Sequence, residues 1–174
     1  MYADINVAFE DEILDFDPAD YELLARQVAS LAKGTHWLCA LANASAQIME
    51  TLPCVNWAGF YLTPAFLGAS DDEGTLLLGP FQGKVACTTI AFGRGVCGTA
   101  AERDEAIVVK DVHAFPGHIA CDGASRSEIV VPIHVGTTVV GVLDIDSPVR
   151  ERFGEADRLG LMGVVRALEE ALGA

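Results

Sequence analysis

Positive charge is scarce in this sequence. Its 174 residues include 11 Lys and Arg against 25 Asp and Glu, so the net charge is −14 at neutral pH. DNA and RNA bind proteins through basic patches, and anionic lipid surfaces attract the same groups. We therefore expect neither nucleic acid nor membrane among the partners of this chain.

Two further absences narrow the class of protein. No apolar run approaches the roughly 20 residues of a transmembrane helix. Residues 1–20 hold seven acids and no Lys or Arg, whereas a secretory signal begins with basic residues. These absences predict a cytoplasmic location, where thiols are mostly reduced and disulfides are usually catalytic.

The five cysteines form no C-x-x-C pair, which argues against a thioredoxin-like motif and a zinc ribbon. Cys39 and Cys54 lie in apolar stretches, so we expect them to be buried packing residues. Cys87, Cys97 and Cys121 lie beside turns or polar residues. These three are the candidates for sulfur chemistry.

The hydrophobic periodicity predicts one domain. Residues 1–16 are expected to form an acidic arm, and residues 17–174 are long enough for a sizeable core. Helices are expected at residues 17–33, 36–51, 96–103 and 155–172, and strands at 55–63, 76–81, 84–92, 106–110, 128–135 and 139–145. This order predicts an α+β fold with a mostly antiparallel sheet. The N- and C-terminal helices should cover one face, and loops with a short helix should cover a pocket on the other.

Cys121 lies in a loop of small and polar residues, three positions after His118. An accessible loop thiol fits a nucleophilic or redox-active role, although a half-buried structural cysteine fits the same residues. Cys97 falls in the first turn of a predicted helix, where the dipole lowers the pKa of a thiol. Cys87 lies within a predicted strand and, taken alone, fits a small core residue.

Three acids are expected to form the floor of the pocket. Asp144 and Asp146 are two apart on a strand, so they should share a face with each other and with Val140 and Val142. Crowded carboxylates, with Glu128 included, raise one another's pKa, so one could donate a proton while others hold an ammonium group. The alternative for the two aspartates is a solvated strand end.

Trp57 and Tyr61 should also share a strand face. Gly59, between them, is expected to leave room for a ligand between the rings. Aromatic walls suit a methyl-sulfur group or a cation, although aromatic core packing explains the same spacing.

Two other motifs have weaker support. Residues 93–98 read G-R-G-V-C-G and match the dinucleotide pattern G-x-G-x-x-G, with Asp111 downstream. The helix is short for a βαβ crossover, so these glycines are expected to make a turn that places Cys97. A zinc site could be assembled from several ligand types, but their spacing matches no standard motif; the residues are Cys87, Cys97, Cys121, His113 and His118.

Six segments together resemble the free methionine-R-sulfoxide reductases, a family of GAF-domain enzymes. They read N-W-A-G-F-Y-L at 56–62, L-G-P-F-Q-G-K at 78–84, F-G-R-G-V-C-G-T-A at 92–100, F-P-G-H-I-A-C-D at 115–122, S-E-I-V-V-P at 127–132 and G-V-L-D-I-D-S at 141–147. The resemblance implies a GAF domain with a six-stranded antiparallel sheet. It also implies reduction of free methionine R-sulfoxide without a cofactor or metal, with thioredoxin as the reductant.

The same resemblance implies roles for individual residues. Cys121 would be the nucleophile, Cys87 the resolving thiol, and Cys97 a second cysteine whose role stays open. Glu128 and Asp146 would be acids of catalysis, and substrate would bind to Trp57, Tyr61, Glu128, Asp144 and Asp146. The chain could form a homodimer. The acidic arm could then cover either the dimer face or the pocket, and the sequence leaves this open. The alternative function is a GAF module that senses a small molecule without catalysis.

Overall fold

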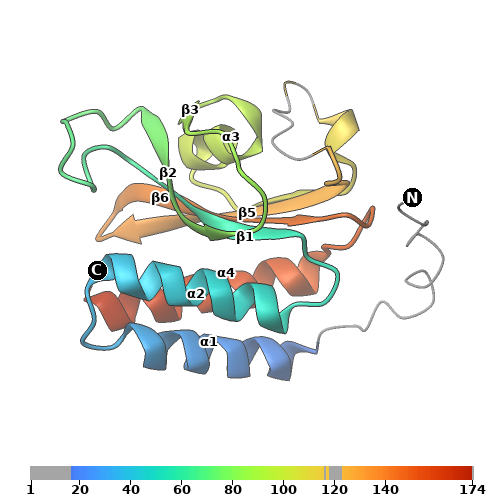
Figure 1. Ribbon diagram of the computed structural model, residues 1–174, viewed down its shortest axis with the longest axis horizontal. Coiled ribbons are helices and arrows are strands. Elements are labelled where there is room, and N and C mark those ends of the chain that lie inside the picture. Colours follow the sequence, from blue (N-terminus) through green and yellow to red (C-terminus); the bar gives the residue numbers. More distant parts are fainter. Residues whose placement is uncertain (1–16, 116, 118–122, 174) are drawn as a thin grey trace.

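The computed structural model describes residues 17–115, 117 and 123–173, and an antiparallel sheet divides them into two layers (Figure 1). The six strands lie in the order β3-β2-β1-β6-β5-β4. They are β1 (Trp57–Leu62), β2 (Thr75–Gln82), β3 (Thr89–Ala91), β4 (Ile107–Val109), β5 (Ser127–Val135) and β6 (Thr138–Ser147). The predicted α+β class and antiparallel sheet are confirmed. The acidic arm, His118 and Cys121 lie outside the described residues.

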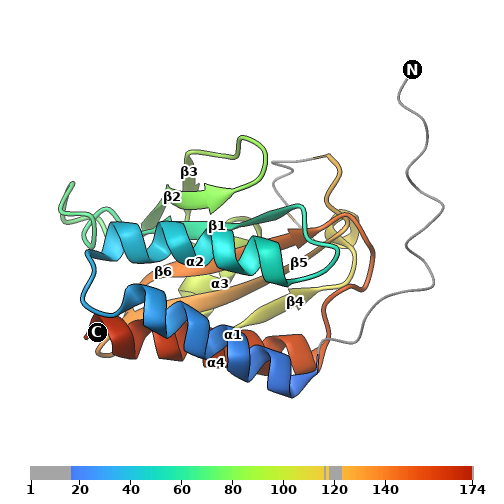
Figure 2. The same cartoon turned by 60° about the horizontal axis from the view of Figure 1, so that its bottom comes forward.

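Three helices cover one face of the sheet, as expected (Figures 1 and 2). They are α1 (Pro18–Ala32), α2 (Trp37–Thr51) and α4 (Glu155–Leu172). The other face carries α3 (Gly95–Arg103), the short 3₁₀ helix η1 (Val112–Ala114) and the loops. Among the described residues, no helix is long and apolar enough to cross a bilayer.

The helix starts follow from local sequence. Asp17 caps α1 by accepting the Ala19 N–H at 2.8 Å, and Asp20 accepts the Asp17 N–H at 3.1 Å. This reciprocal capping satisfies backbone donors that have no partner within the helix. Pro18 follows at the first helical position, where its missing N–H costs nothing.

The two cysteines expected in the core are not buried. Cys39 is exposed and Cys54 is only half-buried, so the prediction for both was wrong. Helix α2 faces the sheet through Leu41, Ala44 and Ile48, which leaves Cys39 on its outer side. Cys54 lies in the turn after α2, with a positive φ of 57°.

The predicted strand at residues 84–92 is much shorter than expected. Only Thr89–Ala91 pairs with β2, and residues 84–88 run over the pocket face without strand structure. Side chains of β1 bind the backbone of this segment. Trp57 Nε1 donates to the Lys84 carbonyl at 3.0 Å, and the Tyr61 hydroxyl donates to the Cys87 carbonyl at 3.1 Å. The segment is thereby fastened above the sheet.

Apolar residues form separate clusters on the two faces of the sheet. The helix-side cluster includes Leu24, Phe60 and Ile145, and the pocket-side cluster includes Tyr61 and Val142. Asp144 and Asp146, at the end of β6, lie on the pocket side of the sheet among these apolar residues.

A β-bulge changes the face of one residue in β6. Ile133 of β5 pairs with Gly141, and His134 pairs with Val139, so Val140 has no residue opposite it. Val140 packs with the helix-side cluster, whereas Val142 packs on the pocket side. The expectation that both valines share the face of Asp144 was therefore wrong for Val140.

A buried polar network fastens α1 to α4. The Tyr21 hydroxyl donates to Asp157 Oδ1 at 2.6 Å, and Arg152 Nη1 donates to the same oxygen at 2.9 Å. Arg152 Nε also donates to the Pro53 carbonyl at 3.0 Å, which adds the turn after α2 to the network. Burial, followed by the Asp157 carboxylate, raises the pKa of Tyr21 well above its ordinary range.

Strand β4 covers only part of its neighbour at the edge of the sheet. Its three residues pair with Glu128, Ile129 and Val130 of β5, and Pro132 lies beyond the last of these pairs. Proline has no N–H to donate to a ladder, so its place next to an uncovered stretch of strand fits its chemistry.

Candidate active site

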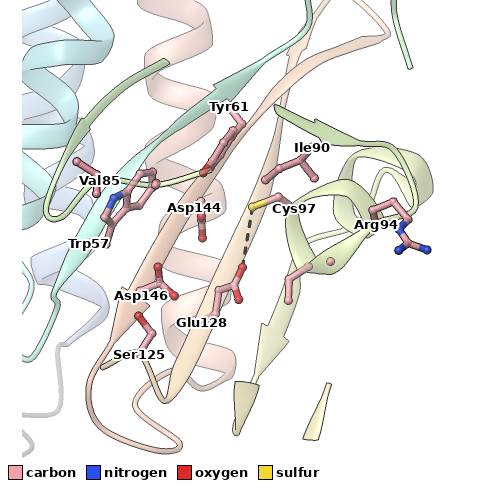
Figure 3. Close-up of a pocket in the computed structure, with 13 residues that line it drawn as sticks. Trp57, Tyr61, Val85, Ile90, Arg94, Cys97, Ser125, Glu128, Asp144 and Asp146 are labelled. Carbon is pink, nitrogen blue, oxygen red and sulfur yellow. Dashed lines mark hydrogen bonds between the residues drawn. The ribbon is translucent and has the colours of Figure 1, made fainter. Parts of the chain in front are cut away.

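A cavity of about 30 Å³ lies between the pocket face of the sheet, the start of α3 and residues 84–88. It is lined by Trp57, Tyr61, Val85, Ala86, Ile90, Arg94, Gly95, Val96, Cys97, Ser125, Glu128, Asp144 and Asp146. Figure 3 shows the acids and the Cys97 thiol facing one another from separate elements. This space is sufficient for at least one water molecule.

Strand register places the three acids side by side. Glu128, near the start of β5, pairs with Asp146 of β6, and Asp144 pairs with Val130 two positions along. On the other side of β6, Trp57 pairs with Asp146. Glu128 and Asp144 are only 5% and 7% exposed, and Asp146 is half-buried. The aspartates therefore do not form a solvated strand end.

Burial controls the protonation of these carboxyl groups. It raises the pKa of Glu128 well above its ordinary value, and the Asp144 and Asp146 carboxylates raise it further. Burial also raises the pKa of Asp144, to about 7. The effect expected from crowding is thus present, with desolvation as its largest cause.

Asp144 has one oxygen that is not satisfied by the protein. No hydrogen-bond partner for its Oδ1 is found among the described residues, although the atom is buried. Arg94 is the one basic side chain among the described residues that line the cavity, and its guanidinium points away from the acids (Figure 3). The cavity thus holds a buried acceptor that a bound cation or ammonium group would satisfy.

Cys97 is buried in the first turn of α3, and its Sγ lies 3.9 Å from Glu128 Oε1. Burial raises the pKa of this thiol well above its ordinary value, and the Asp144 and Glu128 carboxylates raise it further. The prediction that the helix dipole lowers this pKa was wrong. The burial and the negative neighbours outweigh the partial charge at the helix end.

The aromatic pair does share a face, but it leaves no gap. The rings of Trp57 and Tyr61 are stacked with centroids 5.9 Å apart, and Phe81 stacks on Trp57 at 5.3 Å. A Cβ on Gly59 would lie 2.3 Å from the Phe81 Cβ and 2.6 Å from the Trp57 ring. The expected room for a ligand at Gly59 is therefore filled by the protein itself, and the Trp57 ring borders the cavity instead.

Cys87 and His113, which the sequence also singled out, lie outside the group of buried acids and the Cys97 thiol. Cys87 is half-buried beside the pocket-side cluster and is not among the residues that line the cavity. His113 is exposed, with its Nε2 2.7 Å from Arg126 Nη1, and does not join the buried thiol and acids. The glycine motif makes the turn into α3, as expected. Because β3 and β4 lie at opposite edges of an antiparallel sheet, the βαβ unit of a dinucleotide site is not formed.

Several residues of the cavity wall were not predicted from the sequence, among them Ser125 and Val85. Ser125 is 3% exposed and its Oγ accepts a hydrogen bond from Asn56 Nδ2 at 3.2 Å. Val85 is 86% exposed at the mouth. A serine in a polar loop and a valine in a predicted strand give no signal of either position.

The fold, with helices on one sheet face and a cavity under loops on the other, is that of a GAF domain. A family model described as GAF domain matches residues 41–172. Sequence comparison finds a free methionine-R-sulfoxide reductase of Escherichia coli, 51% identical over 83% of this chain and 82% of the relative. The enzyme of the same name from Saccharomyces cerevisiae is 52% identical over 71% of this chain and 68% of the relative.

Structure comparison gives the same result. A free methionine-R-sulfoxide reductase from Neisseria meningitidis, solved in complex with its substrate, superposes with a TM-score of 0.81 and 41% identity, over 90% of each chain. The present chain belongs to the family of the free methionine-R-sulfoxide reductases.

Proposed function

We propose that this protein reduces free methionine R-sulfoxide to methionine through a catalytic cysteine. The observation that carries the proposal is the cavity where a buried thiol, two buried acids and an aromatic wall meet. The relatives named for this reaction support it, because they match over most of both chains.

The acids and Trp57 account for recognition of a free amino acid. An ammonium group would be held by Asp144 and Asp146, with the buried Oδ1 of Asp144 as one acceptor. The methylthio end would pack on the Trp57 ring, since sulfur interacts favourably with aromatic rings. Val85 is exposed at the mouth of the cavity, so we expect it and its neighbours to adjust when the substrate enters.

In the proposed chemistry, the Cys121 thiolate attacks the electrophilic sulfur of the sulfoxide. Glu128 donates the proton that the departing oxygen needs, because burial and the neighbouring carboxylates raise its pKa and favour its protonated form. The oxygen ends on Cys121 as a sulfenic acid, while the substrate sulfur gains the electron pair and leaves as methionine. Asp146 lies beside Glu128 and helps to hold its proton.

Recycling requires a second thiol. Cys87 would condense with the sulfenic acid, forming a disulfide and releasing water, and the dithiol of thioredoxin would then reduce that disulfide. Cys97 is less suited to attack, since its raised pKa keeps it a neutral thiol. A cytoplasmic location and a homodimer are further parts of this proposal.

The first test measures methionine formed from each epimer of free methionine sulfoxide, with dithiothreitol as reductant. The wild-type protein should reduce the R epimer, and Cys121→Ser should lose at least about a thousandfold in rate, as expected for loss of a nucleophile. Cys39→Ser is the control, because Cys39 is exposed on α2. Undiminished turnover by Cys121→Ser would rule out the mechanism. Substrate binding without any methionine formed by the wild type would favour a sensing module.

The second test addresses recycling by thioredoxin. Cys87→Ser should form about one methionine per subunit and then stall, because the sulfenic acid has no partner. The burst is measured by quenching the reaction at short times. Steady turnover of this variant with thioredoxin would instead make Cys97 the resolving cysteine.

A further inference from the structure

We propose that the cavity is also a binding site for one thiophilic divalent cation of the Zn²⁺ class, held by Cys97, Glu128 and Asp144. One donor atom from each residue, the Cys97 Sγ and a carboxylate oxygen from each acid, lies within 4.8 Å of the other two. All three residues are buried. They come from α3, β5 and β6, so the fold itself brings the donors together (Figure 3).

An unsatisfied atom points to a ligand at this place. Asp144 is 7% exposed, and the described part of the chain offers no hydrogen-bond partner to its Oδ1. A buried carboxylate oxygen without a partner is costly unless it is paired or coordinates a metal. Arg94, the basic residue on the cavity wall, points away and does not supply that charge (Figure 3).

The donor set selects the kind of ion. One thiolate with two carboxylates suits Zn²⁺ or Co²⁺, whereas Mg²⁺ and Ca²⁺ prefer oxygen ligands alone. Tetrahedral zinc has bonds of about 2.3 Å to sulfur and 2.0–2.2 Å to oxygen. Ligand atoms around such an ion are separated by a little under 4 Å, which is close to the 3.9 Å between Cys97 Sγ and Glu128 Oε1.

The cavity leaves room for the remaining ligand. Its volume of about 30 Å³ accommodates a water molecule at the fourth position. As the ion binds, the Cys97 thiol and any protonated carboxyl group of Glu128 or Asp144 release their protons to solvent, and the thiolate and the carboxylates form the bonds to the metal. No change of oxidation state is involved.

Occupation of this site would block the enzyme, and this consequence rests on the proposed function. Glu128 and Asp144 cannot bind a cation while they donate a proton and hold the substrate's ammonium group. Zn²⁺ should therefore inhibit competitively with methionine sulfoxide, and a chelator should restore the rate in full.

Binding is tested with Co²⁺ alone on the full chain, reduced beforehand and freed of thiol reductant. One equivalent should give the near-ultraviolet band of a thiolate–cobalt bond together with the visible bands of tetrahedral cobalt. Zn²⁺ should abolish both, and excess Mg²⁺ should leave them unchanged. Cys97→Ala should lose the near-ultraviolet band, and Asp144→Asn should bind roughly tenfold or more weakly. Circular dichroism of each variant checks that it is folded.

Cys39→Ala is the matched control, because Cys39 is exposed and far from the acids in the fold. A near-ultraviolet band that persists in Cys97→Ala, or that disappears in Cys39→Ala or Cys121→Ala, would overturn the assignment. The outcome is independent of turnover. Cobalt binding through Cys97 in a protein without reductase activity would support the metal site and contradict the proposed function. Reductase activity in a protein that shows no near-ultraviolet band would support the proposed function and contradict the metal site.

Discussion

Asp144 combines two properties that conflict in most proteins, a carboxyl group and nearly complete burial. It lies in β6 between apolar neighbours, and its oxygen Oδ1 has no partner among the described residues. Such a residue lowers stability whenever it is charged, so its presence fits a role in binding a cationic group. The same conflict makes its contribution to folding depend on pH.

The first prediction concerns this dependence. Burial raises the pKa of Asp144 from its ordinary 3.8 to about 7, so the folded state binds a proton more tightly than the unfolded state. The stability that this proton provides is fully present below pH 4 and is lost as pH rises through about 7. Between pH 5 and pH 8 the free energy of unfolding should fall, and Asp144→Asn should reduce that fall by about 2–3 kcal/mol.

Urea denaturation at both pH values measures the effect. Glu50→Gln is the control, since Glu50 is exposed on α2. An equal loss of stability with pH in wild type and Asp144→Asn would show that Asp144 is not the group responsible.

Much of the fold could be predicted at the level of elements, because the helix signals are local. The cap at Asp17 and the limits of α4 agree with the sequence analysis. Properties that depend on tertiary contacts could not be predicted. The bulge at Val140, the exposure of Cys39 and the loss of strand structure at residues 84–88 depend on partners distant in sequence.

The candidate site shows the same division. Strand periodicity was sufficient to place Asp144 and Asp146 on one face, and hairpin pairing brings Glu128 beside them. The raised pKa of Cys97 could not be read from its helix position, because it depends on acids from β5 and β6. The packing of Trp57 over Gly59 likewise depends on Phe81 from the neighbouring strand.

The second prediction tests the packing of α1 on α4. A Cβ on Gly160 would lie 2.2 Å from Tyr21 Cγ, and the Tyr21 hydroxyl is held by Asp157. Gly160→Ala should therefore destabilise the protein by about 1–3 kcal/mol, as overpacking does. Gly163→Ala is the matched control on the same helix, because nothing lies within 4 Å of its added Cβ.

Gly163→Ala should gain about 0.5–1 kcal/mol, the usual benefit of replacing glycine inside a helix. Chemical denaturation of both variants gives the comparison. Equal stability of the two would mean that Tyr21 can move aside.

At the scale of the whole molecule, the two faces of the sheet have different roles, one mainly in stability and the other in binding. Its helix side holds most of the core and the Tyr21–Asp157–Arg152 network, while its other side holds the cavity. Changes on the helix side should lower stability without altering the affinity for ligand. Changes in the cavity wall should alter the affinity for ligand, and at buried residues such as Trp57 and Asp144 they should alter stability as well.

The third prediction follows from this separation. Methionine, the proposed product, should raise the thermal unfolding temperature, with a stabilisation of about 2.7 kcal/mol at a concentration 100 times its dissociation constant. Trp57→Ala should lose most of this rise, because the ring is the proposed wall for the methylthio group. Gly160→Ala should keep it, from a lower starting temperature. Differential scanning calorimetry gives the unfolding temperature of the wild type and of both variants, with and without methionine. An undiminished rise in Trp57→Ala would exclude the Trp57 ring as the wall for the methylthio group.

The short length of β4 has a consequence for behaviour at high concentration. Beyond Val130, the outer backbone of β5 has no neighbouring strand in the described sheet, and an uncovered border of this kind can recruit a strand from another molecule and start aggregation. Here residues 131–133 are buried and the His134 N–H donates to Glu169 Oε1, so part of the border is already covered. Pro132 falls within this stretch and interrupts the row of donors that an incoming strand would need. A proline in the middle of an apolar strand thus limits aggregation of a protein whose proposed proton donor, Glu128, lies at the start of the same strand.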